Sequence, residues 1–116
     1  MNRPIKFRVW DHILSEWIKS DQLVLRPNGS ITDGSILIDS KYIQFNTSLK
    51  DKNSKEIYEG DIVKWDGEFI AEVFFEQENA AFVIKSKKGG GAFMSENYVL
   101  NFQIIGNIFE HSELLK

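Results

Sequence analysis

The sequence contains no cysteine, only two prolines and two histidines, and no long hydrophobic run. Without cysteine the chain can form no disulfide, thiolate nucleophile or cysteine-ligated metal site, which fits a reducing cytoplasm. No apolar run approaches the roughly 18 to 20 residues that span a bilayer, and the N-terminal residues lack an apolar signal core. These absences predict a cytoplasmic protein that makes no contact with a membrane.

Apolar residues make up 42% of the chain and aromatic residues 13%, well above the composition of disordered proteins. The length of 116 residues is that of one domain. A chain of this size buries roughly 60% of its unfolded surface or a little more, so we expect an adequate but thin core.

Charge is distributed unevenly along the chain. Residues 1–56 contain nine Lys or Arg and seven Asp or Glu, whereas residues 57–116 contain five and ten, so the two segments carry about +2 and −5. Nucleic-acid-binding proteins usually present a basic patch that neutralises phosphates. The acidic charge of residues 57–116 argues against binding of this segment to a nucleic-acid duplex. It is typical of a solvated surface.

The first half of the chain shows short strand patterns separated by turns. Residues 6–10 alternate between polar and apolar side chains, which is typical of a half-buried strand. The segment 13–18 fits a helix or a strand, and its tryptophan and isoleucine favour a strand. Residues 26–30 predict a turn, because proline presets φ and Asn-Gly accepts a positive φ. Further strands are expected at residues 36–38 and 42–45, before a charged, turn-rich connector at 47–56.

From Ile57 onward the pattern indicates a compact series of strands. Asp66-Gly67 is a strong hairpin signal and predicts a two-residue loop after a strand that begins at Ile62. Such a loop places Val63 opposite Ile70. One face of this hairpin is then apolar and forms the expected core: Ile62, Phe69, Ala71, Val73 and Phe75.

The C-terminal part adds a strand at 81–85, a long alternating strand at 98–104, and a tail at 110–116 that could form one helical turn. Four or five antiparallel strands in about 55 residues are typical of a small, closed or partly open barrel. The sequence thus predicts a mainly β protein in which N-terminal strands and loops, residues 1–56, pack on a small β-barrel, residues 57–116, as one domain.

Three motifs, in order along the chain, indicate a family. They are Lys-Phe-Arg-Val-Trp-Asp at 6–11, the segment 49–64 with its Glu-Gly-Asp strand entry, and Ile-Ile-Gly-Asn-Ile-Phe-Glu at 104–110. Together they resemble the YopX-like proteins carried by phages and prophages of Gram-positive bacteria. The resemblance implies a mainly β fold with a Src-homology-3-type barrel in the second half, a phage or prophage origin in a bacterial host cell, and a tendency to self-associate. It implies no biochemical activity.

Two positions depart from the pattern associated with this family. Glycine is usual just before the position of Leu49 and just after that of Asn53, where this chain has Ser48 and Ser54. Serine has a steric cost at positive φ that glycine avoids. Either these turns differ in this chain, or Asn53 takes the left-handed conformation and Ser54 does not need it.

Paired carboxylates are the first candidates for catalysis. Glu59 and Asp61 flank a glycine, and such pairs act as general acid and base when their pKa values are pushed apart. An aspartate at a strand entry more often accepts hydrogen bonds within a turn, and we favour that interpretation for Asp61. Asp61, Asp66 and Glu68 show no ordered metal-ligand spacing. We therefore predict no catalytic residue and no metal site.

The other chemical candidates are isolated in the sequence. His12 and His111 stand near opposite ends of the chain, and no serine lies in a nucleophile motif. The loop at 85–91 resembles a phosphate-binding loop only superficially, because its lysines precede its glycines. We expect no cofactor, no small-molecule substrate and no enzymatic activity.

The candidate interaction residues are large aromatics and the basic residues of a glycine-rich loop. Trp10 and Trp17 are expected to pack between the two halves of the chain, and Trp65 suits an exposed interface as well as a core. Lys87 and Lys88 could touch a nucleic-acid backbone. We predict a non-enzymatic module that binds a protein partner or a second copy through strand edges and aromatic patches. The alternative is a small barrel that binds nucleic acid.

Overall fold

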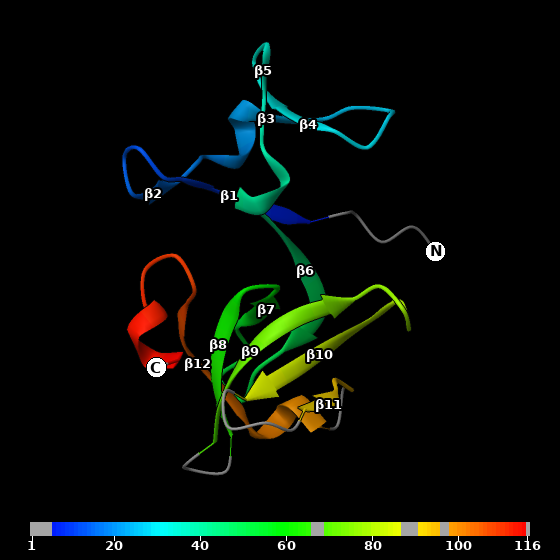
Figure 1. The fold of residues 1–116 in the computed structure, drawn as a ribbon, viewed down its shortest axis with the longest axis vertical. Coiled ribbons are helices and arrows are strands. Elements are labelled where there is room, and N and C mark those ends of the chain that lie inside the picture. The colour runs from blue at the N-terminus through cyan, green and yellow to red at the C-terminus, as the bar shows by residue number, and fades with distance from the viewer. Residues whose placement is uncertain (1–5, 66–68, 87–90, 96–97, 116) are drawn as a thin grey trace. The chain divides into compact units, whose positions relative to one another are not determined.

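The computed structural model describes residues 6–65, 69–86, 91–95 and 98–115. Over these residues the chain is all-β, with antiparallel strands in three sheets, short 3-10 helices and no α-helix (Figure 1). The predicted mainly β class is confirmed. The chain divides into two compact units, Met1–Phe45 and Asn46–Lys116, and each is described by itself. The expectation that residues 1–56 pack on the second half and need not fold alone stays a prediction.

Unit 1 (Met1–Phe45) consists of short strands joined by tight turns. Its elements are β1 (Phe7–Asp11), β2 (Glu16–Trp17), η1 (Ser20–Gln22), β3 (Leu23–Leu25), β4 (Ile31–Asp33), β5 (Ile36–Leu37), η2 (Ser40–Tyr42) and the start of β6 (Ile43–Lys50). β1 pairs with β2 on one side and with the first residues of β6 on the other. β3, β4 and β5 form a three-stranded antiparallel meander.

The turn between β3 and β4 forms as its residues predict. Gly29 has a φ of 89°, and its N–H donates to the carbonyl of Arg26. The side chain of Asn28 accepts from the N–H of Ser30 at 3.0 Å. The predicted turn at residues 26–30 is confirmed.

The first hairpin is shorter than predicted. Asp11 Oδ1 accepts from the N–H groups of Ile13 and Leu14 at 2.9 and 3.0 Å, which closes a turn directly after β1. Because this turn uses the residues that follow β1, the predicted strand over 13–18 is confirmed only at Glu16–Trp17.

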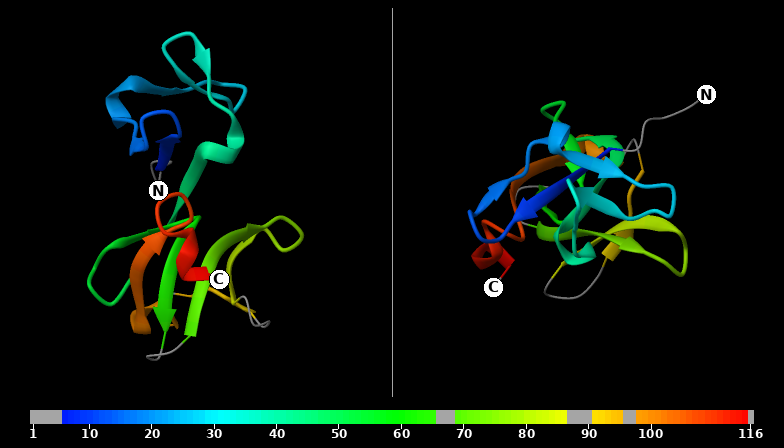
Figure 2. Two further views of the ribbon diagram at one scale, coloured as in Figure 1. Left: turned by 60° about the vertical axis from the view of Figure 1, so that its left-hand side comes forward. Right: turned by 90° about the horizontal axis from the view of Figure 1, so that it is seen from above.

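Unit 2 (Asn46–Lys116) contains a five-stranded antiparallel sheet in the order β11-β10-β9-β8-β12. Its elements, besides the end of β6, are β7 (Glu56–Tyr58), β8 (Asp61–Trp65), β9 (Phe69–Glu76), β10 (Ala81–Ser86), β11 (Gly91–Phe93), η3 (Tyr98–Asn101), β12 (Phe102–Asn107) and η4 (Ser112–Leu115). The second half of β6 pairs with β7. Figure 2 shows the terminal turn η4 beside β9, and the two elements are in contact.

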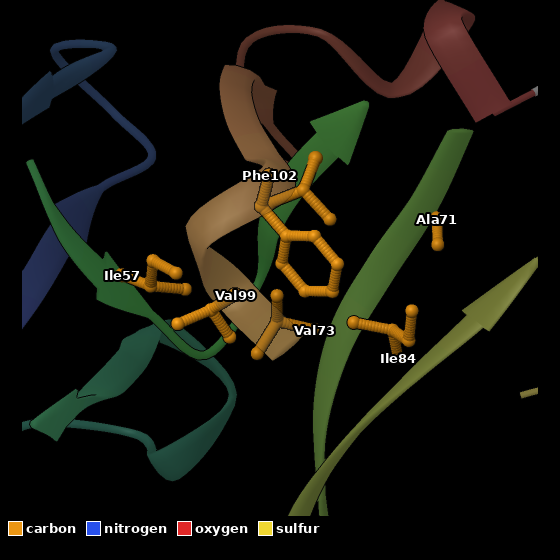
Figure 3. Close-up of a cluster of buried hydrophobic side chains, with 7 residues drawn as sticks. Ile57, Ala71, Val73, Ile84, Val99 and Phe102 are labelled. Carbon is orange, nitrogen blue, oxygen red and sulfur yellow. The ribbon is translucent and has the colours of Figure 1, made fainter. Parts of the chain in front are cut away.

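The core of unit 2 lies on one face of this sheet. Figure 3 shows the Phe102 ring directed toward Val73, with aliphatic side chains from neighbouring elements around it. The buried members are Ile57, Val63, Ala71, Val73, Ile84, Val99 and Phe102. Since full burial of one large apolar side chain contributes about 1.5–3 kcal/mol, this cluster is the main stabilising feature of the unit.

The register of the β8–β9 hairpin differs from the predicted one by one residue. Val63 lies opposite Ala71 and Trp65 opposite Phe69, so three residues separate the strands where two were expected. A shift of one residue exchanges the two faces of a strand. Val63, and not Ile62, therefore joins Ala71 and Val73 in the core, whereas Ile62 lies opposite Glu72 on the other face. Two other members of the predicted core face, at the ends of β9, are exposed: Phe69 at 56% and Phe75 at 43%. Asp66-Gly67 itself lies outside the described residues.

The long strand predicted over 98–104 begins only at Phe102. Residues 98–101 form the 3-10 helix η3, and the N–H of Val99 donates to the carbonyl of Ser95, which precedes this helix. Val99 is buried and Leu100 is 59% exposed. Val99 is therefore the apolar side chain of residues 98–101 that enters the core. The alternating pattern that placed Leu100 on the same face as Phe102 did not indicate this.

The connector predicted over 47–56 is confirmed as a turn only at 51–55, and its ends belong to strands. β6 continues to Lys50, and β7 begins at Glu56, which leaves only a short turn between them. Thr47 Oγ1 donates to the carbonyl of Ile57 at 2.8 Å and holds the two strands together. The predicted helical turn of the tail is confirmed as η4, in which both leucines are partly buried.

Candidate functional site

Trp10 and Trp17 contact each other within unit 1. Trp10 is opposite Trp17 in the β1–β2 pair, and the two rings meet edge to face with centroids 5.0 Å apart. The Arg8 guanidinium lies 4.2 Å from the centre of the Trp17 ring, and Arg8 Nε donates to Gln44 Oε1 at 2.9 Å. Trp10 is only 7% exposed. Trp10 is therefore buried, and Trp17 is the more accessible of the pair.

Trp65 is partly buried and packs against the core of unit 2. Its ring lies 5.6 Å from that of Phe69 and 6.4 Å from that of Phe102, measured between centroids. Trp65, one of the predicted interaction residues, thus lies at the border of the core beside the exposed Phe69. Lys87 and Lys88 lie outside the described residues.

The two carboxylates of the Glu-Gly-Asp segment have different surroundings. Asp61 is 2% exposed, and its Oδ2 accepts from the N–H of Tyr58 at 2.7 Å. The interpretation of Asp61 as a turn acceptor at the start of β8 is therefore confirmed. Gly60 between the carboxylates has a φ of 84°, and its N–H donates to the carbonyl of Val73.

Glu59 influences a different carboxylate, that of Glu72 on β9. Burial raises the pKa of Glu72, and the negative charge of Glu59 raises it further. Glu72 lies between Ile62 on β8 and Lys85 on β10, on the face of the sheet away from the core. The sequence did not indicate Glu72 as a titratable residue with a raised pKa.

Asp51 is a buried carboxylate that accepts three backbone hydrogen bonds, and sequence analysis did not identify it. It is 3% exposed, and its Oδ1 accepts from the N–H groups of Asn53 and Lys55, each at 2.9 Å. Its Oδ2 accepts from the N–H of Ile104 on β12 at 3.0 Å. Asp51 therefore joins the β6–β7 turn to a strand 53 residues later in the chain. This contact spans too long a sequence separation for local patterns to indicate it.

Both serines that replace the usual glycines have left-handed backbone conformations. The φ of Ser48 is 67° and that of Ser54 is 63°. The N–H of Ser48 donates to Asn46 Oδ1, and that of Ser54 donates to the carbonyl of Asp51. The turns therefore keep the geometry for which glycine is suited, and the alternative in which Asn53 alone takes positive φ is wrong.

An exposed aromatic row crosses three strands of the five-stranded sheet. Phe74 on β9 lies opposite Val83 on β10, which lies opposite Phe93 on β11. Val83 is 4% exposed, whereas Phe74 is 37% and Phe93 57% exposed. The Lys85 ammonium lies 5.4 Å from the centre of the Phe74 ring. We call Phe74, Val83 and Phe93 the aromatic row.

A shallow depression of about 260 Å³ adjoins the aromatic row. Its lining combines apolar side chains of β10 and β11 with one acid and one base: Glu76, Val83, Ile84, Lys85, Gly91, Ala92 and Phe93. β11 is the last strand on its side of the sheet. A mainly apolar hollow with two charged residues in its lining, beside a strand edge, is suited to bind an extended chain.

The two histidines are in different units and serve local contacts. His12 stacks on Tyr42 with centroids 4.5 Å apart, and His111 Nδ1 accepts from the N–H of Asn107. Among the described residues, no group of three or more His, Cys, Asp or Glu side chains could hold a metal ion. No helix within the described ranges has the length and hydropathy needed to cross a bilayer.

Comparison with known proteins identifies the family. The crystal structure of protein EF1440 from Enterococcus faecalis is similar with a TM-score of 0.61 and 24% identity, and the alignment covers 99% of this chain and 100% of that chain. At that identity the likeness shows the fold alone. Comparison with functionally curated proteins gave no match. A family model described as YopX protein matches residues 6–116, so the chain belongs to the YopX family.

Proposed function

We propose that this YopX family protein is a non-enzymatic binding module of phage or prophage origin that holds an extended segment of another protein. The observation that carries the proposal is the aromatic row, in which exposed Phe74 and Phe93 flank buried Val83. Aromatic side chains on rigid strands are typical anchors of protein interfaces, because they bury a large area at a small cost in conformational entropy.

The binding mode follows from the edge strand. An incoming extended chain adds to β11 by backbone hydrogen bonds and places an apolar side chain in the adjoining depression. Lys85 and Glu76 in the lining of the depression supply one charge of each sign, which favours a segment whose residues carry both signs. The row lies on the face opposite to the core, so occupation requires no change in core packing.

Affinity capture and titration test the proposal. Wild-type protein is used to capture a partner from host cells, and the purified partner is then titrated by calorimetry. The double variant Phe74→Ser and Phe93→Ser is expected to bind it at least tenfold more weakly, since each loses an exposed anchor. The control is Leu100→Ser, which removes a side chain of similar exposure, 59%, outside the row. Equal affinity of the double variant and the control would reject the aromatic row as the binding surface.

We also infer that unit 2 is a partly open barrel of the Src-homology-3 type. The inference is supported by one core cluster that receives side chains from β7, β8, β9, β10, η3 and β12. Nuclear Overhauser effects between methyl groups of Ile57 and Val73 are expected if these strands enclose a common interior. Their absence in a folded sample would contradict the inference.

Nucleic-acid binding is the second candidate. The observation in its favour is a group of exposed lysines around the β6–β7 turn: Lys50, Lys52 and Lys55. Fluorescence anisotropy with single- and double-stranded DNA and RNA at two salt concentrations tests it, because phosphate contacts weaken steeply with salt. No signal at low salt would dismiss this function.

A further inference from the structure

Within the described residues, β5 is the last strand on one side of the three-stranded sheet of unit 1. Ile36 and Leu37 form this strand, and each is 67% exposed. Successive strand residues point to opposite faces, so an apolar side chain is exposed on each face of the same edge. Soluble proteins usually protect an edge with charge, proline or a covering segment, and β5 itself contains none of the first two.

The free backbone groups of β5 can be assigned from its register. Thr32 lies opposite Leu37, and the N–H of Ile38 donates to the carbonyl of Ile31 at 3.0 Å. In an antiparallel pair, bonded and non-bonded residue pairs alternate. Ile36 and Ile38 therefore direct their N–H and C=O groups toward β4. Leu37 directs its own pair toward the open edge.

We propose that β5 pairs antiparallel with β5 of a second copy of this chain, with Leu37 of each copy exchanging both backbone hydrogen bonds across a twofold axis. This interaction is separate from the aromatic row of the proposed function. Antiparallel pairing is the arrangement that a twofold axis imposes on two identical edge strands. It joins two three-stranded sheets into one continuous sheet.

The side chains of residues 35–39, on either side of Leu37, are compatible with this pairing. With Leu37 on the axis, Ile36 of each copy lies opposite Ile38 of the other, so aliphatic side chains meet on one face. Ser35 lies opposite Asp39, so a hydroxyl faces a carboxylate, and no like charges are opposed. Both residues are exposed and able to make this contact. Cross-strand pairs of these kinds stabilise sheets by roughly 0.2–1 kcal/mol each.

The same sheet exposes aliphatic side chains at its other outer strand. Val24 and Leu25 on β3 are 43% and 38% exposed. Because the β5 pairing alone is short, it produces a small interface and a dimer that depends on concentration. The net charge of −3 gives only weak repulsion between copies.

Disulfide trapping tests the pairing directly, because the chain contains no cysteine of its own. Residues in a hydrogen-bonded antiparallel pair have Cα atoms about 5.5 Å apart, within the range that a disulfide bridges. Leu37→Cys is expected to form a covalent dimer rapidly under mild oxidation. Leu100→Cys, on an equally apolar and exposed position of unit 2, is the matched control and should not. Equal rates of cross-linking for the two variants would overturn the proposal.

Sedimentation equilibrium supplies the second measurement. Wild-type protein is expected to dimerise at about 100 µM, and Leu37→Pro to weaken the dimer at least tenfold, since proline removes the outward N–H and leaves the bonds to β4. A circular-dichroism spectrum like that of the wild type shows that the variant is folded. Monomeric wild-type protein at that concentration would overturn the proposal, as would an unchanged dimer in Leu37→Pro. Either failure leaves partner binding by the aromatic row unaffected, so the two proposals are tested separately.

Discussion

Replacement of Asp51 tests whether a single buried carboxylate holds the two ends of unit 2 together. Asp51→Ala removes the acceptor of three backbone N–H groups, those of Asn53, Lys55 and Ile104. Asn53 and Lys55 are exposed, so water can replace the carboxylate there. The N–H of Ile104 is partly buried and loses its partner in the interior.

The magnitude follows from these three donors. A hydrogen bond to a charged group contributes about 1.5–3 kcal/mol, and an unsatisfied buried donor costs about 1–3 kcal/mol. With solvent replacing the two exposed bonds in part, we expect Asp51→Ala to lower the free energy of unfolding by about 3–5 kcal/mol. Asp51→Asn retains one acceptor oxygen for the turn, but its amide group faces the N–H of Ile104 as a second donor. We expect that variant to lose about 2–3 kcal/mol.

Urea unfolding measures these differences, with circular dichroism and the fluorescence of Trp65 in a Trp10→Phe and Trp17→Phe background as the signals. The control is Glu78→Ala in the exposed turn after β9, for which a change within about 0.5 kcal/mol is expected. A loss below about 1 kcal/mol for Asp51→Ala would refute the reasoning. The same holds if Asp51→Asn is as stable as the wild type, because the Ile104 contact would then contribute nothing.

Two further perturbations act on backbone conformation and on charge. Ser48→Gly and Ser54→Gly should each stabilise the protein by about 0.5–1 kcal/mol. A non-glycine residue in the left-handed conformation costs about 1–2 kcal/mol, and the greater entropy of glycine in the unfolded state offsets about half of the gain from removing that cost. A loss of stability in urea unfolding would contradict the positive φ of these residues. For Glu72, the raised folded-state pKa means that the native state retains the proton more strongly than the unfolded state, so stability falls as pH rises from 4.5 through the folded pKa. Glu72→Gln should therefore be more stable than the wild type at neutral pH, with the difference vanishing below pH 4.5, and a constant difference at every pH would show that the carboxylate is not responsible.

Patterns of neighbouring residues predicted which turns and strands form. They predicted the register between paired strands less well. The turn at 26–30 and the turn acceptor Asp61 follow from neighbouring residues alone, and both are confirmed. The register of β8 and β9 depends on one residue of loop length, which changes the face on which Ile62 lies. Dipeptide signals such as Asp66-Gly67 do not fix that length.

The residues of the aromatic row were harder to predict from the sequence for a similar reason. Alternation indicates which strand residues share a face, but exposure depends on where neighbouring strands end. Phe75 and Phe69 lie on the core face and are nevertheless exposed, because they stand at the ends of β9. Phe93 was not singled out because β11 has only three residues and no strong pattern. Trp10, a candidate interaction residue that was expected to pack, is buried.

The most direct test of the binding role is amide hydrogen exchange of the protein alone and with its captured partner. Added-strand binding predicts slower exchange in β10 and β11 in the complex, together with little change in β7 on the far side of the core. Slower exchange confined to β7 and the β6–β7 turn, with β10 and β11 unaffected, would contradict the assignment of the aromatic row as the binding surface.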